Sequence, residues 1–218
     1  MENYKKNLKL LTKNHVYSKE MEHDACGVGL IASTEGKKSR AIVEYGIEAL
    51  KAVWHRGAVD ADGKTGDGAG IHVEIPKDFF IEKIQVTGHD YDNSEICVGM
   101  IFLPRNDYSA QESCKTIVES ELTKNNFSIY GWRQVPVNPK VLGEKALQTM
   151  PEIIQVLFKS NDPNLLDKNL ERKIYETRKR IENKAFDASL NNFYICSISS
   201  KSIIYKGLYL AAVSYTHL

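Results

Sequence analysis

Four cysteines could make this chain reactive, because a thiolate is both a nucleophile and a metal ligand. No two of them have C-x-x-C spacing, and no cysteine and histidine cluster has the spacing of a zinc site. Cys97 and Cys196 stand in apolar stretches and are predicted to be buried structural thiols, whereas the setting of Cys114 indicates nothing further. Cys26 differs in its neighbours, the string HDACGVGLIA. One way in which it could act is a papain-like thiol–imidazole pair with His55.

A second segment with chemical potential is the loop HRGAVDADGKTGDGAG at residues 55–70, which is dense in glycine and aspartate. The glycines at 66, 68 and 70 superficially match a phosphate-cradling loop. However, no Gly-Lys-Ser/Thr follows, and the next residues have the pattern of a strand rather than of a helix N-terminus. We therefore predict a tight glycine-rich turn and no nucleotide site.

The composition is that of a globular domain, with 42 % apolar and 26 % charged residues in 218. The formal net charge of +1 favours neither nucleic acid nor a membrane surface as a partner. No stretch is long enough to span a bilayer, and the first 25 residues lack the apolar run of a secretory signal. With so few cysteines, we expect a reducing compartment and a cytoplasmic protein.

The elements that must position these residues begin with a buried strand, predicted where glycines alternate with Val28 and Leu30 in residues 26–33. Ser39 is predicted to cap a helix over 40–53, whose apolar stripe holds Val43, Ile47 and Leu50. A half-buried strand over 71–75 then ends at Pro76.

The second half of the chain alternates apolar runs with helical patterns. Ser109 and Glu112 match a capping box for a helix that ends near Lys124. Leu166, Leu170 and Ile174 share one face of a helical stretch that Asp162-Pro163 opens. Strands are predicted over 96–103, 127–135, 153–158, 193–198 and 203–205, helical turns over 143–149, and a hairpin at 199–201. Many strands with few βαβ alternations indicate an α+β layered fold.

The string around Cys26 resembles the processing site of the glutaminase domains of glutamate synthases. In register with it, HRGA (55–58), TGDGAGI (65–71) and the following IPKDFF resemble strings of the same family. Further matches are VGMIFLP, LGEKALQTMPEIIQ and FYICSISSKSIIYKG. The resemblance runs from about residue 20 to about residue 210, nearly the whole chain.

The resemblance implies an N-terminal-nucleophile fold, a four-layer αββα sandwich, and self-cleavage of the precursor between Ala25 and Cys26. Cys26 would then carry both the thiol that attacks the glutamine amide and the free α-amine that serves as its base. Arg56 and Gly57 match the family's HRG element, which lies against the nucleophile and positions it. From the residues alone, Arg56 is interpreted as a loop arginine in a structural salt bridge. His55 is interpreted as structural, because the implied mechanism does not require it.

The resemblance also implies partners and cofactors. L-Glutamine is the expected substrate, and its ammonia would pass to the remaining synthase domains of the same chain. FMN and an iron–sulfur cluster belong to those domains, with none expected in this segment, and a small electron-donating subunit is a further candidate partner.

Two parts of the family pattern have no match here: the Asn-Gly pair of the oxyanion hole, and the arginine and aspartate that hold the α-carboxylate and α-amine of glutamine. Asn191-Asn192 precedes a strand and is not followed by glycine. The substrate-binding residues therefore stay unknown, and we expect a sandwich that is incomplete at its C-terminal end. The expected division is a propeptide at 1–25, a partial amidotransferase domain at 26–211 and a non-native tail at 212–218.

Three alternatives remain beside the glutaminase. The same fold could serve another amidotransferase or amide hydrolase, although the long insertion from 90 to 192 favours glutamate synthase. The chain could instead be a catalytically inactive fragment, or an interaction module in which Cys26 is never freed. A papain-like pair of Cys26 with His55 leaves the processing-site string unexplained.

Overall fold

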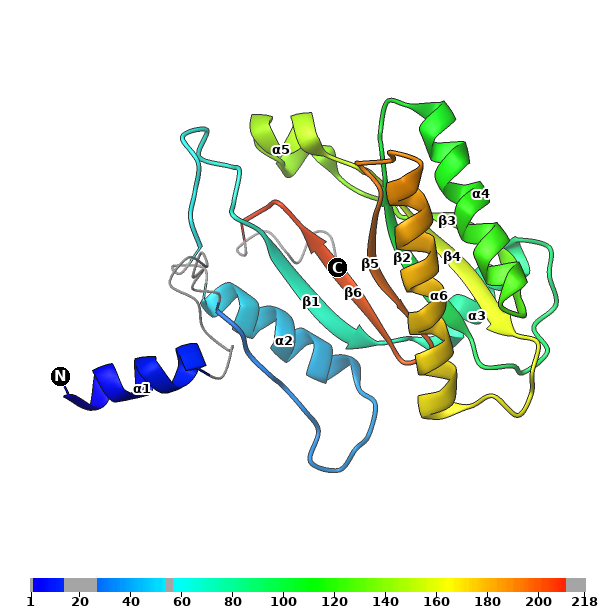
Figure 1. Cartoon of the computed structure of the whole chain (residues 1–218), viewed down its shortest axis with the longest axis horizontal. Coiled ribbons are helices and arrows are strands. Elements are labelled where there is room, and N and C mark those ends of the chain that lie inside the picture. The colour runs from blue at the N-terminus through cyan, green and yellow to red at the C-terminus, as the bar shows by residue number, and fades with distance from the viewer. Residues whose placement is uncertain (1, 14–26, 54–56, 211–218) are drawn as a thin grey trace.

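A computed structural model describes residues 2–13, 27–53 and 57–210, and Figure 1 shows the elements along the chain. The described elements are listed in chain order: α1 (Glu2–Lys13), α2 (Arg40–Ala52), β1 (Ala69–Glu74), α3 (Lys77–Val86), β2 (Cys97–Leu103), α4 (Tyr108–Lys124), β3 (Phe127–Gln134), the 3-10 turn η2 (Pro139–Val141), α5 (Glu144–Thr149), β4 (Glu152–Ser160), α6 (Asp167–Asp187), β5 (Tyr194–Ser199) and β6 (Ser202–Gly207). No helix in these three ranges is long and apolar enough to cross a membrane.

Four strands form an antiparallel sheet in the order β3-β4-β2-β5. Successive side chains of a strand point to opposite faces, and in β2 both faces are buried. Ile101 and Leu103 face one apolar cluster, whereas Val98 and Met100 face the other. This double burial explains why β2 reads as an almost unbroken apolar run.

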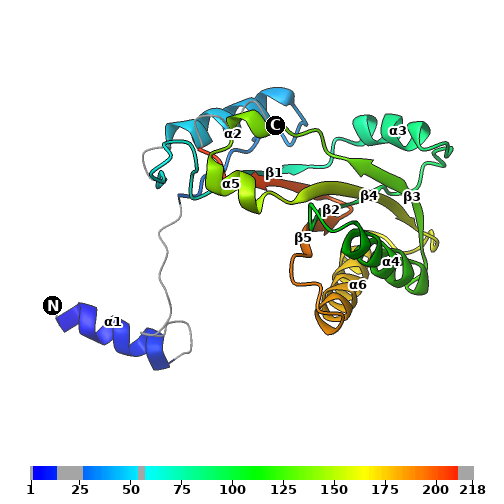
Figure 2. The ribbon, with the colours of Figure 1, turned by 90° about the horizontal axis from the view of Figure 1, so that it is seen from above.

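Helices α4 and α6 lie together on one face of this sheet, as the view from above shows (Figure 2). Leu122 of α4 and Leu170, Ile174 and Ile181 of α6 are almost completely buried against Phe158 of β4. Burying a side chain of this size is worth roughly 1.5–3 kcal/mol, so the helix faces and the sheet stabilise one another.

The second sheet pairs β1 with β6, antiparallel, from Ala69 opposite Gly207 to Glu74 opposite Ser202. A second apolar cluster lies between the two sheets and includes Ile203 of β6, Leu157 of β4, and Phe80 and Ile84 of α3. Helix α2 packs on the far side of β1 in both views (Figures 1 and 2). The protein is thus a mixed α and β fold built on two antiparallel sheets.

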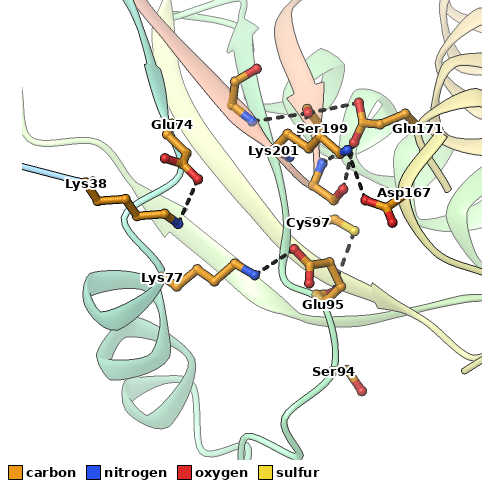
Figure 3. Close-up of polar contacts among 12 residues, drawn as sticks. Lys38, Glu74, Lys77, Ser94, Glu95, Cys97, Asp167, Glu171, Ser199 and Lys201 are labelled. Carbon is orange, nitrogen blue, oxygen red and sulfur yellow. Dashed lines mark hydrogen bonds and ion pairs between the residues drawn. The ribbon is translucent and has the colours of Figure 1, made fainter. Parts of the chain in front are cut away.

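A carboxylate in the first turns of α6 holds the turn between β5 and β6. Glu171 accepts hydrogen bonds from the Ser199 hydroxyl at 3.0 Å, from the Ser200 backbone N–H at 2.7 Å and from the Ser200 hydroxyl at 2.8 Å. Figure 3 shows this carboxylate facing the turn. Because β6 belongs to the second sheet, Glu171 joins that sheet to the helix behind the first.

Several sequence expectations are confirmed. Ser39 caps α2 by accepting a hydrogen bond from the Ala41 backbone, and Ile47 is the buried residue of the predicted stripe. The runs at 96–103, 127–135 and 153–158 form β2, β3 and β4, and the turns at 143–149 form α5. The runs at 193–198 and 203–205 form β5 and β6, but the hairpin predicted at 199–201 is wrong, because these two strands belong to different sheets and do not pair.

Other expectations are corrected. Asp107, not Ser109, caps α4, because its carboxylate accepts from the Ala110 backbone N–H and starts the helix earlier. Asp162 instead closes a turn by accepting from the Asn164 backbone, so α6 begins at Asp167 and Leu166 remains exposed. The sequence patterns predicted neither α1 nor α3.

The strand predicted over 26–33 is also wrong for residues 27–33, which form no strand. Val28 and Leu30 are 92 % and 89 % exposed, respectively. A strand requires a hydrogen-bonded neighbour, and alternation of apolar residues within one segment does not supply that neighbour.

Candidate functional site

The structure describes only one of the three predicted catalytic residues. Cys26 and Arg56 lie outside the described residues, as does His55. Gly57 is described and is an exposed residue at the start of the loop that leads to β1. The site must therefore be located from the residues that flank the other two.

Those flanking residues lie next to each other. Gly27 follows Cys26, and Val53 ends the described segment that precedes His55 and Arg56. A Cβ atom built on Gly27 would lie 3.9 Å from both Cβ and Cγ2 of Val53. The segment after the predicted nucleophile thus meets the end of α2, from which the chain continues to the predicted positioning residues.

A large open groove of about 1490 Å³ extends from this meeting point. Gly27, Leu50 of α2 and residues 67–70 line one part of it, and Lys206 and Tyr209 lie beside them. Asn191 and Asn192 also line the groove, although they are not the Asn-Gly pair of the family pattern. The groove is large enough for an amino-acid substrate.

The glycine-rich loop is a tight turn, as predicted, and leads into β1 rather than into a helix. Val59 and Gly66 form an isolated antiparallel bridge, and Gly63 takes a φ of +67°. At Gly70, a Cβ would lie only 2.7 Å from the Tyr205 carbonyl oxygen, so the glycine permits the close pairing of β1 with β6.

The other three thiols are free and buried, which confirms the interpretation of Cys97 and Cys196 as structural. Burial raises the pKa of Cys114 to about 11 and also raises the pKa of Cys97 and Cys196. At neutral pH these thiols stay protonated and are therefore poor nucleophiles. None of the three therefore has the lowered pKa of a reactive thiol.

A smaller hollow of about 500 Å³ lies at the other end of β1, near the β5–β6 turn. Its lysines form ion pairs, shown in Figure 3: Lys38–Glu74 at 2.7 Å, Lys77–Glu95 at 2.8 Å and Lys201–Asp167 at 3.1 Å. Because each ammonium is already paired, the hollow offers little free charge to a ligand. In the part of the chain that the structure describes, no cluster of His, Cys, Asp and Glu could hold a metal ion.

The family model of class-II glutamine amidotransferases matches residues 26–217, so the match begins at the predicted nucleophile. The chain belongs to the class-II glutamine amidotransferases. As an amidotransferase domain it is 52 % identical over 208 residues to the glutamate synthase [NADPH] large chain of Azospirillum brasilense. That alignment covers 95 % of this chain and 14 % of the relative.

Two ferredoxin-dependent glutamate synthases are similar to the same amidotransferase residues. The Pyropia yezoensis protein is 40 % identical and is covered over 13 % of its length, against 94 % of this chain. The chloroplastic protein of Spinacia oleracea is 39 % identical, with 12 % of its length and 86 % of this chain covered. The chain thus spans about one seventh or less of the length of these relatives.

Sequence reasoning missed one feature of the candidate site. The loop after Gly57 is held by Gly143 and Lys145, about 85 residues further along the chain. The one signal in the sequence was a glycine directly before a helix. Glycine at such a position can indicate that another segment packs too closely for a side chain.

Proposed function

We propose that this chain is the glutaminase part of a glutamate synthase, hydrolysing L-glutamine to glutamate and ammonia. The observation that supports this most strongly is the family match that begins at Cys26. The similar proteins quoted above are glutamate synthases, with either NADPH or ferredoxin in their names. Another amidotransferase or amide hydrolase is therefore a weaker hypothesis.

The mechanism starts with cleavage between Ala25 and Cys26, which frees an α-amine on the residue that carries the thiol. A free thiol has a pKa near about 8.5 and an α-amine near about 7.7–8.0. The amine can accept the thiol proton at neutral pH, and the thiolate attacks the amide carbon of glutamine. Ammonia leaves with that proton, a thioester remains, and water then releases glutamate and restores the thiol.

The groove beside Gly27 is the proposed site of the glutamine substrate. In this proposal Arg56 and Gly57 position Cys26 and its surroundings at one end of that groove. The oxyanion donors and the groups that hold the α-carboxylate and α-amine of glutamine belong to residues after this segment. Those residues would also complete the four-layer αββα sandwich, with 1–25 as propeptide and the amidotransferase domain beginning at residue 26.

The synthase chemistry belongs elsewhere in the parent protein. An iron–sulfur cluster requires several cysteine thiolates at one place, whereas the three described cysteines are buried as separate thiols. The described cysteines do not fit this cofactor, and in this proposal FMN and the cluster belong to the downstream domains. Those domains, which receive the ammonia, and a small electron-donating subunit are the proposed partners, in the cytoplasm.

The test uses the full-length enzyme with either glutamine or added ammonia as the nitrogen source. Cys26→Ala should abolish glutamine-dependent glutamate formation and leave the ammonia-dependent rate unchanged, because the thiol is needed only to release ammonia. Cys114→Ala is the matched control and should retain both rates. Normal turnover of glutamine by Cys26→Ala would contradict the proposed function.

A further inference from the structure

The loop over residues 57–68, called the site loop below, has its own hydrogen-bonded frame. The Asp60 backbone N–H donates to the Thr65 carbonyl at 2.9 Å, and the Gly63 N–H donates to the Asp60 carbonyl at 2.9 Å. At the tip, the Asp62 carboxylate accepts from the Thr65 hydroxyl at 2.5 Å and from the Thr65 backbone N–H at 2.7 Å. These bonds make the loop a compact unit that can be moved or held as a whole.

An ion pair joins this unit to α5. The Lys145 ammonium lies 2.5 Å from Oδ2 of Asp60, and the two residues are 85 positions apart. The hydrogen bond from Lys145 lowers the pKa of the Asp60 carboxyl, so the pair is charged on both sides at neutral pH. A pair this exposed adds little to global stability, and its effect is to fix local geometry.

Gly143 makes the second connection by allowing close approach. A Cβ at this position would overlap Asp62 Oδ2 and Thr65 Oγ1 and would lie 2.5 Å from the Thr65 backbone nitrogen. The φ of Gly143 is −76°, an ordinary value for any residue. Glycine is therefore required here by the lack of space and not by the backbone conformation. The tip of the site loop occupies the space that a side chain would need.

The opposite side of the loop is also in contact. A Cβ on Gly66 would lie 2.7 Å from the Tyr209 carbonyl oxygen and 2.9 Å from the Leu210 nitrogen. The site loop therefore lies between α5 and the segment that follows β6. Figures 1 and 2 both show α5 beside the loop that precedes β1.

We propose that Gly143 and Lys145 are positioning residues for glutamine hydrolysis. They form a latch that fixes the site loop, and through it Gly57. Gly57 is only three residues from Asp60, so the Cα atoms of the two residues are at most about 10 Å apart. The latch also connects the two sheets. In the sequence, α5 stands between β3 and β4 of the larger sheet, whereas the site loop leads into β1 of the smaller one.

The size of the effect follows from how steeply rates depend on geometry. Misplacing a reacting group by about 1 Å can lower a rate by about 10²-fold, even when the change is far from the chemistry. A side chain at position 143 must push the loop tip away, so Gly143→Ala should lower the kcat for glutamine by about tenfold or more. Lys145→Glu puts a carboxylate beside Asp60 and should lower the same kcat several-fold.

This proposal rests on the proposed function, and the experiment separates the two. Full-length enzyme is assayed with glutamine and with ammonia for Gly143→Ala, Lys145→Glu, Asp60→Lys and the double variant Asp60→Lys/Lys145→Glu. The double variant restores an ion pair of reversed polarity, so its kcat for glutamine should recover most of the loss. Lys115→Glu is the control, because it removes a comparable surface pair with Glu112 on α4, at 2.9 Å.

The expected pattern is a lower kcat with glutamine, an unchanged ammonia-dependent rate and rescue in the double variant. If the latch variants match Lys115→Glu while Cys26→Ala is inactive with glutamine, the latch is wrong and the proposed function stands. If Cys26→Ala turns over glutamine normally, the proposed function fails first. Should Gly143→Ala not fold, the Asp60 and Lys145 variants still decide, and absence of rescue overturns the latch.

Discussion

The two sheets of this protein differ in how completely they are covered. In the four-stranded sheet, β2 is flanked by strands on both edges and by apolar clusters on both faces. The β1–β6 sheet has only two strands, and α2 above it contributes a single buried residue, Ile47. The segment after the predicted nucleophile meets α2 on the side of this less covered sheet. The open groove is lined by residues of both sheets, among them Gly70 and Lys206 of the smaller sheet and Met100 and Tyr194 of the larger.

The difference separates stability from chemistry. On the face covered by α4 and α6, the apolar cluster of the four-stranded half includes no side chain of the β1–β6 sheet, so that cluster does not depend on the smaller sheet. The half that bears the proposed site has exposed apolar side chains such as Val28 and Leu30 and a loop held by a few polar contacts. Catalytic residues are often carried by loops that a rigid scaffold positions, and the four-stranded half is that scaffold.

Shortening the domain should have the largest effect on the activity of the half that bears the proposed site. Residues 1–211 alone should release ammonia from glutamine at least about 10²-fold more slowly than a version extended through the complete domain, because even one missing oxyanion donor costs about 10²–10³-fold in rate. Ammonia release by the two proteins, at equal concentration, is the measurement. Comparable turnover by the short form would show that the less covered half already holds every catalytic group.

A smaller effect, on the free energy of unfolding, should come from two matched side-chain truncations, one in each half. Phe158 is fully buried and stacks edge-to-face on Phe127 at 5.3 Å, so Phe158→Ala should lower the free energy of unfolding by about 3–5 kcal/mol. Val28→Ala removes a 92 % exposed side chain and should change it by less than about 0.5 kcal/mol. Urea denaturation of this chain gives both values. A loss of several kcal/mol for Val28→Ala would mean that this segment is packed after all.

The same contrast explains what could be predicted from the sequence. The apolar runs of β2 and β4 and the stripe of Leu170 and Ile174 could be recognised in the sequence. They are buried as predicted because the residues that cover them lie within the described chain. The segment at 27–33 has an equally apolar pattern, yet a pattern within one segment does not reveal whether a neighbouring strand is available. Only Phe80 and Ile84 of α3 are fully buried, and two residues four positions apart are too few to define a helical period in the sequence.

The site itself was predictable only in part. The strings around Cys26 and Arg56 indicated the chemistry, since a motif preserves the types and order of reacting residues. The contact of Gly143 with the site loop could not be predicted from the sequence, because it joins residues that only the folded chain brings together. Long-range packing of this kind requires a structure.

The central claim is that Cys26 becomes an N-terminal nucleophile, and peptide mass spectrometry of the full-length enzyme tests it most directly. The purified enzyme is treated at neutral pH with an electrophilic analogue of glutamine and then digested. We expect a peptide that begins at Cys26 and carries the adduct, with Cys97, Cys114 and Cys196 unmodified because burial keeps their thiols protonated. Active enzyme that retains residues 1–25, or an adduct on one of the other three cysteines, would contradict the claim.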